Sequence, residues 1–129
     1  MVIDSSALVA MALDEPERVR FNGAVLGAGE RLVASPTLLE TAMVLADRNG
    51  RTGLEALQRT LRLMRITVLA VDAHDSSIAV RAYLTYGKGR HRARLNFGDC
   101  ISYAVAKTRG QQLLYKGDDF SHTDIERAA

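Results

Sequence analysis

Acidic side chains stand next to several segments of this sequence that are predicted to be buried. Asp4 directly follows the apolar opening of the chain, and Asp118 and Asp119 follow the run QLLYKG. Glu40 and Asp99 lie near the beginnings of two predicted helices. In open α/β sheets, ligands bind at the edge formed by the carboxyl ends of the strands. We therefore expect these acids to gather at one sheet edge, where they could carry out metal-dependent chemistry.

Each acid also has an ordinary structural explanation. Asp4 could cap the helix that follows it, and Asp99 could form a reciprocal cap with Asn96. The others could lie in a turn or face solvent. However, Glu40 and Asp99 lie within the apolar stretches LLETAMV and FGDCISYAVA, which leave little polar surface for them. Partly buried carboxylates repel by roughly 4 kcal/mol per pair at 4 Å and an effective dielectric near 20, and a divalent cation removes that cost. A metal site is the better joint explanation.

The ligand types indicate which metal this would be. No pair of histidines has the spacing of zinc ligands, and Cys100 is the only cysteine, whereas carboxylate oxygens suit Mg²⁺ or Mn²⁺. Mg²⁺ keeps several waters and binds one or two carboxylates together with phosphate oxygens of a substrate. Such an ion polarises a phosphodiester and activates a water for in-line attack. Cys100 is interpreted as a small core residue, because nothing near it in the sequence would lower its pKa.

Positive charge gathers before the last predicted helix, since residues 76–98 contain no acid. An acidic site beside a basic segment suggests metal chemistry on a polyanion. A solvated loop is the ordinary explanation of a basic run. We predict that the basic arm, residues 88–94, contacts phosphates of the polyanion through Lys88, Arg90, Arg92 and Arg94.

The length and composition describe one ordinary globular domain, residues 1–129. Of the 129 residues, 47% are hydrophobic and 25% charged, with a net charge of +2, which is close to average usage. Aromatic residues make up 5% and there is no Trp, which argues against a base-stacking platform for single strands. No basic segment precedes a long apolar run, so we expect neither a signal peptide nor a membrane span. The lone cysteine favours a reducing compartment, and we expect a cytoplasmic protein.

The apolar patterns predict strands that alternate with helices. Strands are predicted at residues 2–3, 31–35, 66–71 and 112–115, with a further edge strand at 122–125. Helices are predicted at residues 6–13, within 14–29, and at 37–47, 51–65, 72–86 and 97–109. Ser35 and Pro36 are expected to begin the third of these as N-cap and N1, and Gly50 to end it. The alternation predicts an α/β fold with a central, mostly parallel sheet of four to five short strands and helices on both faces.

Four segments carry a family resemblance. They are MVIDSSALVAMALDEPE, SPTLLETAMVL, GKGRHRARLNFGDCISYAVAK and LLYKGDDF, which follow one another over essentially the whole chain. Together they resemble PIN-domain ribonucleases of the VapC toxin type. The resemblance implies a PIN-like three-layer fold and a Mg²⁺-dependent endoribonuclease that acts on tRNA or other structured RNA and leaves 3′-hydroxyl and 5′-phosphate ends. It also implies a homodimer and inhibition by a small VapB-type antitoxin.

The catalytic acids of that family match positions of this chain. The resemblance makes Asp4, Glu40 and Asp99 the acidic core, with the first and last of these as metal ligands. The fourth acid has two candidates, because Gly117 stands where many relatives carry an acid or Asn. We predict Asp118 as the fourth catalytic acid and Asp119 as the alternative.

Further roles follow for other residues. Ser6 resembles the small hydroxyl residue that supports the first acid in this family, and the polyanion contacted by the basic arm would be RNA. For the antitoxin, we predict a groove beside Asp4 on helices 7–13 and 17–26. Its apolar residues would be Val9, Leu13, Val19, Phe21 and Leu26.

Two other functions are alternatives at this point. A phosphate-accepting, receiver-like signalling domain has a similar size and build, and Asp72 follows a predicted strand where its phospho-acceptor would lie. That interpretation leaves Glu40 and Asp99 unexplained and lacks an acidic pair after the first strand. The other alternative is a PIN fold that has lost catalysis and serves as a binding protein, against which the intact acids argue.

Overall fold

A computed structural model describes all 129 residues. Four parallel strands form one sheet in the order β3-β2-β1-β4. The strands are β1 (Val2–Ile3), β2 (Leu32–Ala34), β3 (Thr67–Leu69) and β4 (Leu113–Leu114). The helices are α1 (Ser5–Ala12), α2 (Arg18–Gly27), α3 (Ser35–Leu63), α4 (Ala73–Tyr86) and α5 (Phe97–Thr108), and a 3-10 turn, η1, covers Asp119–His122. The predicted α/β fold with a parallel sheet is confirmed.

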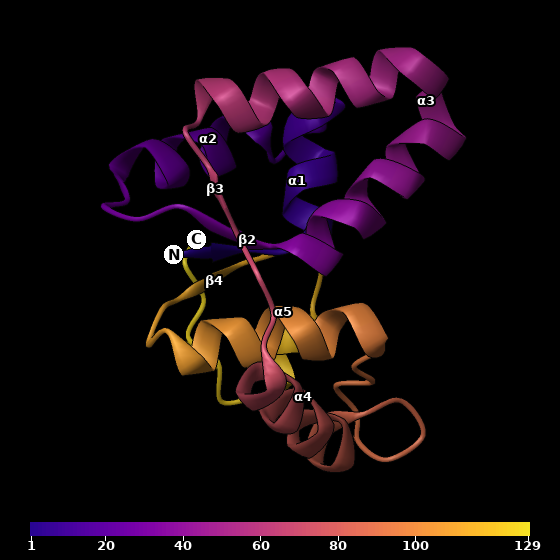
Figure 1. Cartoon of the computed structure of the whole chain (residues 1–129), viewed down its shortest axis with the longest axis vertical. Helices are drawn as coiled ribbons and strands as arrows, with labels where there is room; N and C mark the ends of the chain where they lie inside the picture. Colours follow the sequence, from indigo (N-terminus) through magenta and orange to yellow (C-terminus); the bar gives the residue numbers. More distant parts are fainter.

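The alternation of side chains along the short strands divides the core between two faces of the sheet. Val2 and Leu113 pack in the cluster that includes α4 and α5. Their neighbours Ile3 and Leu114 pack in the cluster that includes α1 and α2. Figure 1 shows α4 and α5 on one side of the sheet and α1, α2 and α3 on the other, which gives three layers. No helix is long and apolar enough to cross a bilayer.

Reciprocal caps begin both helices of the α4–α5 layer. Asp72 and Asp75 exchange side-chain-to-backbone hydrogen bonds at the start of α4. Asn96 and Asp99 do the same at the start of α5, as predicted. Only Oδ2 of Asp99 takes part in its cap, so the capping role is compatible with a role in a site.

A sharp kink divides α3 at Gly50, which has φ 55° and ψ −138°. Glycine adopts such a positive φ without steric cost, and the predicted break between two helical segments is confirmed. The second half of α3 folds back over α1, and Leu57 packs there with Val9 and Leu45.

Two local predictions are wrong, and a third, the strand at 66–71, is confirmed with shorter bounds. Ala34, not Ser35, holds the cap position of α3, because Ser35 joins Pro36 in the first helical turn, where a proline φ is already suitable. Residues 122–125 form no strand, since the Thr123 hydroxyl makes local hydrogen bonds instead, to the Phe120 carbonyl and from the Ile125 N–H. The strand predicted at 66–71 is only three residues long and lies at the exposed sheet edge.

The strand order reverses beside β1. The chain runs outwards from β1 to β2 and β3, and then returns to place β4 on the other side of β1. In such sheets, ligands bind at the carboxyl ends of the strands where the order reverses. Asp4 follows β1 and residues 116–119 follow β4, so both lie at this switch point.

Candidate active site

Asp4 lies at the carboxyl edge of the sheet, between β1 and α1, and only 2% of its surface is exposed. Its Oδ2 accepts hydrogen bonds from the Ser6 backbone N–H at 3.0 Å and from the Ser6 hydroxyl at 2.6 Å. Its Oδ1 accepts a hydrogen bond from the Ser102 hydroxyl at 2.7 Å. Asp4 therefore caps α1 and is also a buried carboxylate in a fixed orientation, and Ser6 contacts it as expected.

Sequence reasoning missed two buried hydroxyl groups behind Asp4. Ser102 on α5 is fully buried, and its hydroxyl oxygen lies 3.4 Å from that of buried Thr37 on α3. The signal was available, because Ser102 follows Asp99 by three residues in an otherwise apolar run. Residues at that spacing share one face of a helix.

Glu40 reaches the same edge from α3. Its carboxylate lies against Gly98 of α5, where a Cβ would stand 2.6 Å from Oε2 of Glu40. Only glycine leaves room for this approach. Burial raises the pKa of Glu40, a hydrogen bond from the Ser5 side chain opposes the rise, and the charge of Asp4 adds to it.

Asp99 lies in the first turn of α5 and is the most perturbed acid of the group. Burial raises its pKa from the ordinary 3.8 to about 6, against the hydrogen bond from the Asn96 backbone. The charges of Asp4, Asp119 and Glu40 raise the pKa further. Four carboxylates from four separate segments therefore act on one another across the sheet edge.

The loop after β4 supplies the last of these acids. Asp118 and Asp119 are both exposed, and they follow Gly117, whose φ of 93° turns the chain. Of the two, Asp119 is the acid whose charge acts on Asp99. The sequence interpretation placed Asp118 first, and the effect on Asp99 is the reason to propose Asp119 beside it.

Lys116 ties this loop to the rest of the site, a role that sequence reasoning also missed. Its backbone N–H donates to the Ser6 hydroxyl at 3.0 Å, and that hydroxyl in turn donates to Asp4. Its ammonium pairs with Glu15 at 2.7 Å and Glu17 at 3.0 Å, both in the segment between α1 and α2. The hydrogen bonds that this ammonium donates to the two carboxylates raise the pKa of Lys116.

The basic arm forms a loop between α4 and α5, closed at its base by a bridge between Gly87 and Leu95. Its residues surround an open hollow of about 550 Å³ that has no apolar side chain in its lining. The four predicted phosphate contacts are all exposed, and none of them forms an ion pair: Lys88, Arg90, Arg92 and Arg94.

The apolar groove predicted on α1 and α2 is not present in that form. Val9 and Phe21 belong to the core, and of the five residues only Val19 and Leu26 are exposed. The apolar surface lies elsewhere. Leu39 and Met43, which were expected to help cover Glu40, are exposed on α3.

A larger apolar surface lies along α4 and α5. A hollow of about 620 Å³ there is lined mainly by apolar side chains, among them Val80, Tyr83 and Ile101. Phe97, at the start of α5, borders this hollow and is 83% exposed. Cys100 also lines it but is buried, and burial raises the pKa of its thiol to about 11, which agrees with the core interpretation.

The donor set is consistent with a hard divalent cation. No three carboxylate, histidine or cysteine side chains are arranged so that together they could hold a metal ion. Mg²⁺ needs no such group of three, because it binds one or two carboxylates and completes its shell with waters and phosphate oxygens. Asp4 and Asp99 offer oxygen ligands whose mutual repulsion a cation would relieve.

Comparison with known proteins agrees with this fold. The PIN domain model matches residues 1–126. The chain is 51% identical over its full length to ribonuclease VapC30 of Mycobacterium tuberculosis, of which it covers 98%. It is 48% identical to a ribonuclease VapC of Mycolicibacterium smegmatis, with 97% of each chain covered. The crystal structure of M. tuberculosis VapC20, described as a sarcin-ricin loop cleaving toxin, has the same fold, with a TM-score of 0.74, 22% identity, and 96% of this chain and 95% of that chain covered.

The chain therefore belongs to the PIN domain family, and within it to the VapC-type ribonuclease toxins. This membership excludes the receiver-like alternative. Asp72, which that alternative needed as a phospho-acceptor, instead caps α4.

Proposed function

We propose that this ribonuclease toxin is a Mg²⁺-dependent endoribonuclease whose catalytic acids are Asp4, Glu40, Asp99 and Asp119, with Asp118 as the alternative fourth acid. One observation carries the proposal. Carboxylates from separate segments lie at one partly buried edge, where burial first, and then the charges of neighbouring acids, raise the pKa of both Glu40 and Asp99. A protein keeps such repulsion where it serves a function, and a divalent cation would relieve it.

Each residue of the site has a role in this proposal. Asp4 and Asp99 bind Mg²⁺, or Mn²⁺ in its place. When bound, the ion supplies polarisation of the phosphodiester and activation of a water for in-line attack. Ser6 and Ser102 hold the two oxygens of Asp4 in a fixed direction. Glu40 and Asp119 extend the acidic surface, and their carboxylates accept hydrogen bonds from the waters around the bound phosphate.

The proposed substrate is structured RNA, tRNA among the candidates. The relatives are named ribonucleases, and the exposed, unpaired cations of the basic arm suit a phosphate backbone. The arm joins directly to α5, which carries Asp99, so phosphates bound there would lie next to the acidic edge.

Two protein partners complete the proposal. A VapB-type antitoxin packs an amphipathic helix of its own against Leu39 and Met43 of α3. These two side chains are 62% and 60% exposed, and they lie before and after Glu40 in the sequence. A second copy of the chain covers the apolar surface along α4 and α5, and forms a homodimer.

The decisive experiment measures RNA cleavage with and without Mg²⁺. Asp99→Asn keeps the volume and the capping acceptor of Asp99 but removes one charge, so it should abolish cleavage by a protein that remains folded. Asp47→Asn, at an exposed position of α3, is the matched control and should cleave like the wild type. Cleavage at the wild-type rate by Asp99→Asn, or by the wild type in EDTA, would contradict the proposal. A wild type that cleaves no RNA but binds its antitoxin would favour the catalytically inactive alternative.

Sequencing the 5′ ends that arise after induction in cells would identify the RNA. Co-expression with the product of the neighbouring small open reading frame should restore growth and give a complex that co-purifies.

A further inference from the structure

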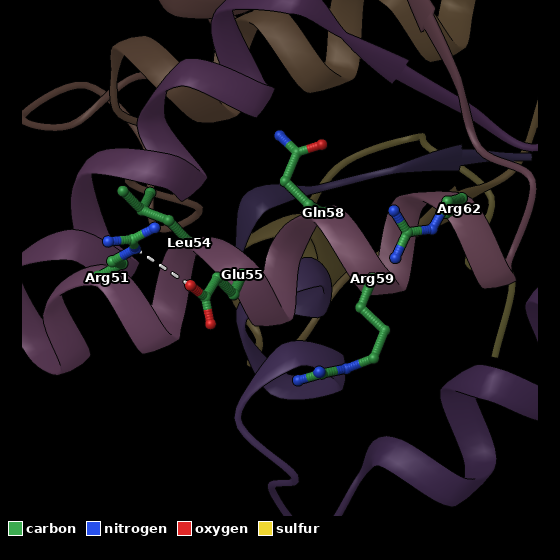
Figure 2. Close-up of a pocket in the computed structure, with 6 residues that line it drawn as sticks. All are labelled: Arg51, Leu54, Glu55, Gln58, Arg59 and Arg62. Atoms are coloured by element: carbon green, nitrogen blue, oxygen red, sulfur yellow. Dashed lines mark hydrogen bonds and ion pairs between the residues drawn. The ribbon is translucent and has the colours of Figure 1, made fainter.

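The second half of α3 carries a basic face that the proposed site does not use. It borders an open hollow of about 470 Å³. Figure 2 shows the six side chains around this hollow, Arg51, Leu54, Glu55, Gln58, Arg59 and Arg62. Arg51 and Glu55 are joined at 3.2 Å. Arg59 and Arg62 are exposed and form no ion pair or side-chain hydrogen bond.

The charge of this face is fixed by the sequence and by the packing of the helix. The lining holds three arginines and one glutamate, a net charge of +2. Two more arginines flank it, Arg65 and Arg48, of which Arg48 pairs with Glu15 at 3.7 Å. The opposite side of the helix is held against α1 through Leu57. The arginines of the hollow therefore lie on the solvent side of the helix and present a positive surface there.

We propose that this face, the α3 basic face, binds the phosphate backbone of structured RNA at a second place, away from the acidic edge. A guanidinium group matches the geometry of a phosphate and donates two parallel hydrogen bonds to it. From Arg51 to Arg62 the helix rises about 16 Å, which is long enough to meet several phosphates. An amphipathic helix of a protein partner needs apolar anchors, and Leu54 is the only apolar side chain in the lining.

The place of the α3 basic face in the fold determines which substrates would use it. Glu40 belongs to the first half of α3, and ten residues of helix, about 15 Å, separate it from the kink at Gly50. The basic arm leaves the other helical layer, on the opposite side of the sheet (Figure 1). An RNA that contacts both surfaces must therefore be large and folded, while a short oligonucleotide at the acidic edge reaches only the arm. The inference rests on the proposed function for the identity of the polyanion.

The test compares three double variants with the wild type in EDTA, where binding is measured without turnover. Arg59→Ala with Arg62→Ala removes two charges from the α3 basic face. Arg90→Ala with Arg92→Ala removes two from the basic arm. Arg20→Ala with Arg81→Ala is the matched control, because it removes two exposed arginine charges from α2 and α4 that form no ion pair. Each protein is titrated with bulk tRNA and with an RNA hexamer at several salt concentrations.

The α3 variant should lower the slope of log K against log salt for tRNA by about 1.4 to 1.8, since each lost phosphate contact removes about 0.7 to 0.9. Its affinity for the hexamer should equal that of the wild type. The arm variant should weaken both probes, and the control neither. If the α3 variant keeps the wild-type slope for tRNA, or if the control lowers it equally, the inference is wrong.

Two further outcomes keep this inference separate from the proposed function. Loss of antitoxin binding by the α3 variant, with unchanged tRNA binding, would assign the face to a protein partner and overturn the inference. Failure of the wild type to cleave RNA with Mg²⁺ would defeat the proposed function. The inference would still be tested separately, because the salt dependence of RNA binding in EDTA does not depend on turnover. If the alanine variant lacks a cooperative thermal transition, Arg59→Gln with Arg62→Gln removes the same charges with less loss of side chain.

Discussion

The charge of Asp99 lowers the stability of the folded protein at neutral pH. Asp99 is harder to ionise in the fold than in the unfolded chain, because burial and three neighbouring acids raise its pKa from 3.8 to about 6. The folded state therefore holds more protons than the unfolded state between these two values. Stability contributed by the neutral form is fully present below about pH 4 and is lost as the pH rises through 6. The corresponding cost at neutral pH is at most about 3 kcal/mol.

We therefore predict that Asp99→Asn stabilises the metal-free protein at pH 7.5. The free energy of unfolding should rise by up to about 3 kcal/mol, because the variant cannot ionise while its amide oxygen still accepts the Asn96 hydrogen bond. The gain should fall to less than about 1 kcal/mol at pH 4, where Asp99 is neutral in the folded protein and only about half ionised in the unfolded chain. Urea denaturation in EDTA at both pH values measures this, with Asp47→Asn as a control that should show no gain. A gain of equal size at both pH values, or a loss at pH 7.5, would contradict the electrostatic account.

Residue types and their spacing were enough to single out most of the acidic site. Asp4, Glu40 and Asp99 stood out because carboxylates are rare in apolar stretches, and the structure brings their charges together. The Asp118 and Asp119 pair could not be resolved by spacing, since the direction of each side chain depends on how Gly117 turns the loop. Ser102 was missed although it follows Asp99 by three residues, because that spacing places it on the same helix face without showing that its hydroxyl meets Asp4.

At the level of elements, the site depends on how three loops are joined. Lys116 lies in the loop after β4, and through its ammonium and its backbone N–H it connects Glu15, Glu17 and Ser6. Ser6 then contacts Asp4. The position of the β4 loop is thus coupled to the orientation of the central acid, in the way that outer contacts orient the ligands of a metal.

We predict that Lys116 is a positioning residue. Lys116→Met should weaken Mn²⁺ binding, measured by calorimetry, and lower kcat by about 10- to 100-fold, the usual effect of losing such a support, with little change in KM. Lys116→Arg, which keeps the ion pairs, should restore both quantities. Arg20→Met on exposed α2 is the control for loss of one charge. Should Lys116→Met lower the thermal stability alone, and leave Mn²⁺ affinity and kcat unchanged, the residue is merely structural.

Elements that are determined locally were predictable, and elements that depend on distant partners were not. The capping boxes of α4 and α5 need only residues four positions apart at most, and both helices start where predicted. The length of β3 and the absence of a strand at 122–125 depend on which neighbouring segment supplies backbone hydrogen bonds. Leu113 pairs with Arg127 there, a partner that no local pattern indicated.

For the whole molecule, the surfaces divide by chemistry. The acidic edge lies between the basic arm and the α3 basic face, which project from opposite layers of the sheet. The main apolar surface runs along α4 and α5, on the layer away from α1 and α2. This separation would let RNA contact, antitoxin binding and self-association use different parts of one small domain.

The last prediction concerns self-association through that apolar surface. Phe97 is 83% exposed beside the hollow of about 620 Å³, and a stable dimer buries about 800 Å² on each partner around such anchors. Phe97→Glu places a charge at the centre of this contact, so it should convert a dimer into a monomer in light scattering at micromolar concentrations. Val19→Glu is the matched control, because Val19 is 84% exposed on α2 and should leave the mass unchanged. A wild type that is monomeric at all concentrations, or a control that dissociates equally, would show that α4 and α5 do not form the dimer contact.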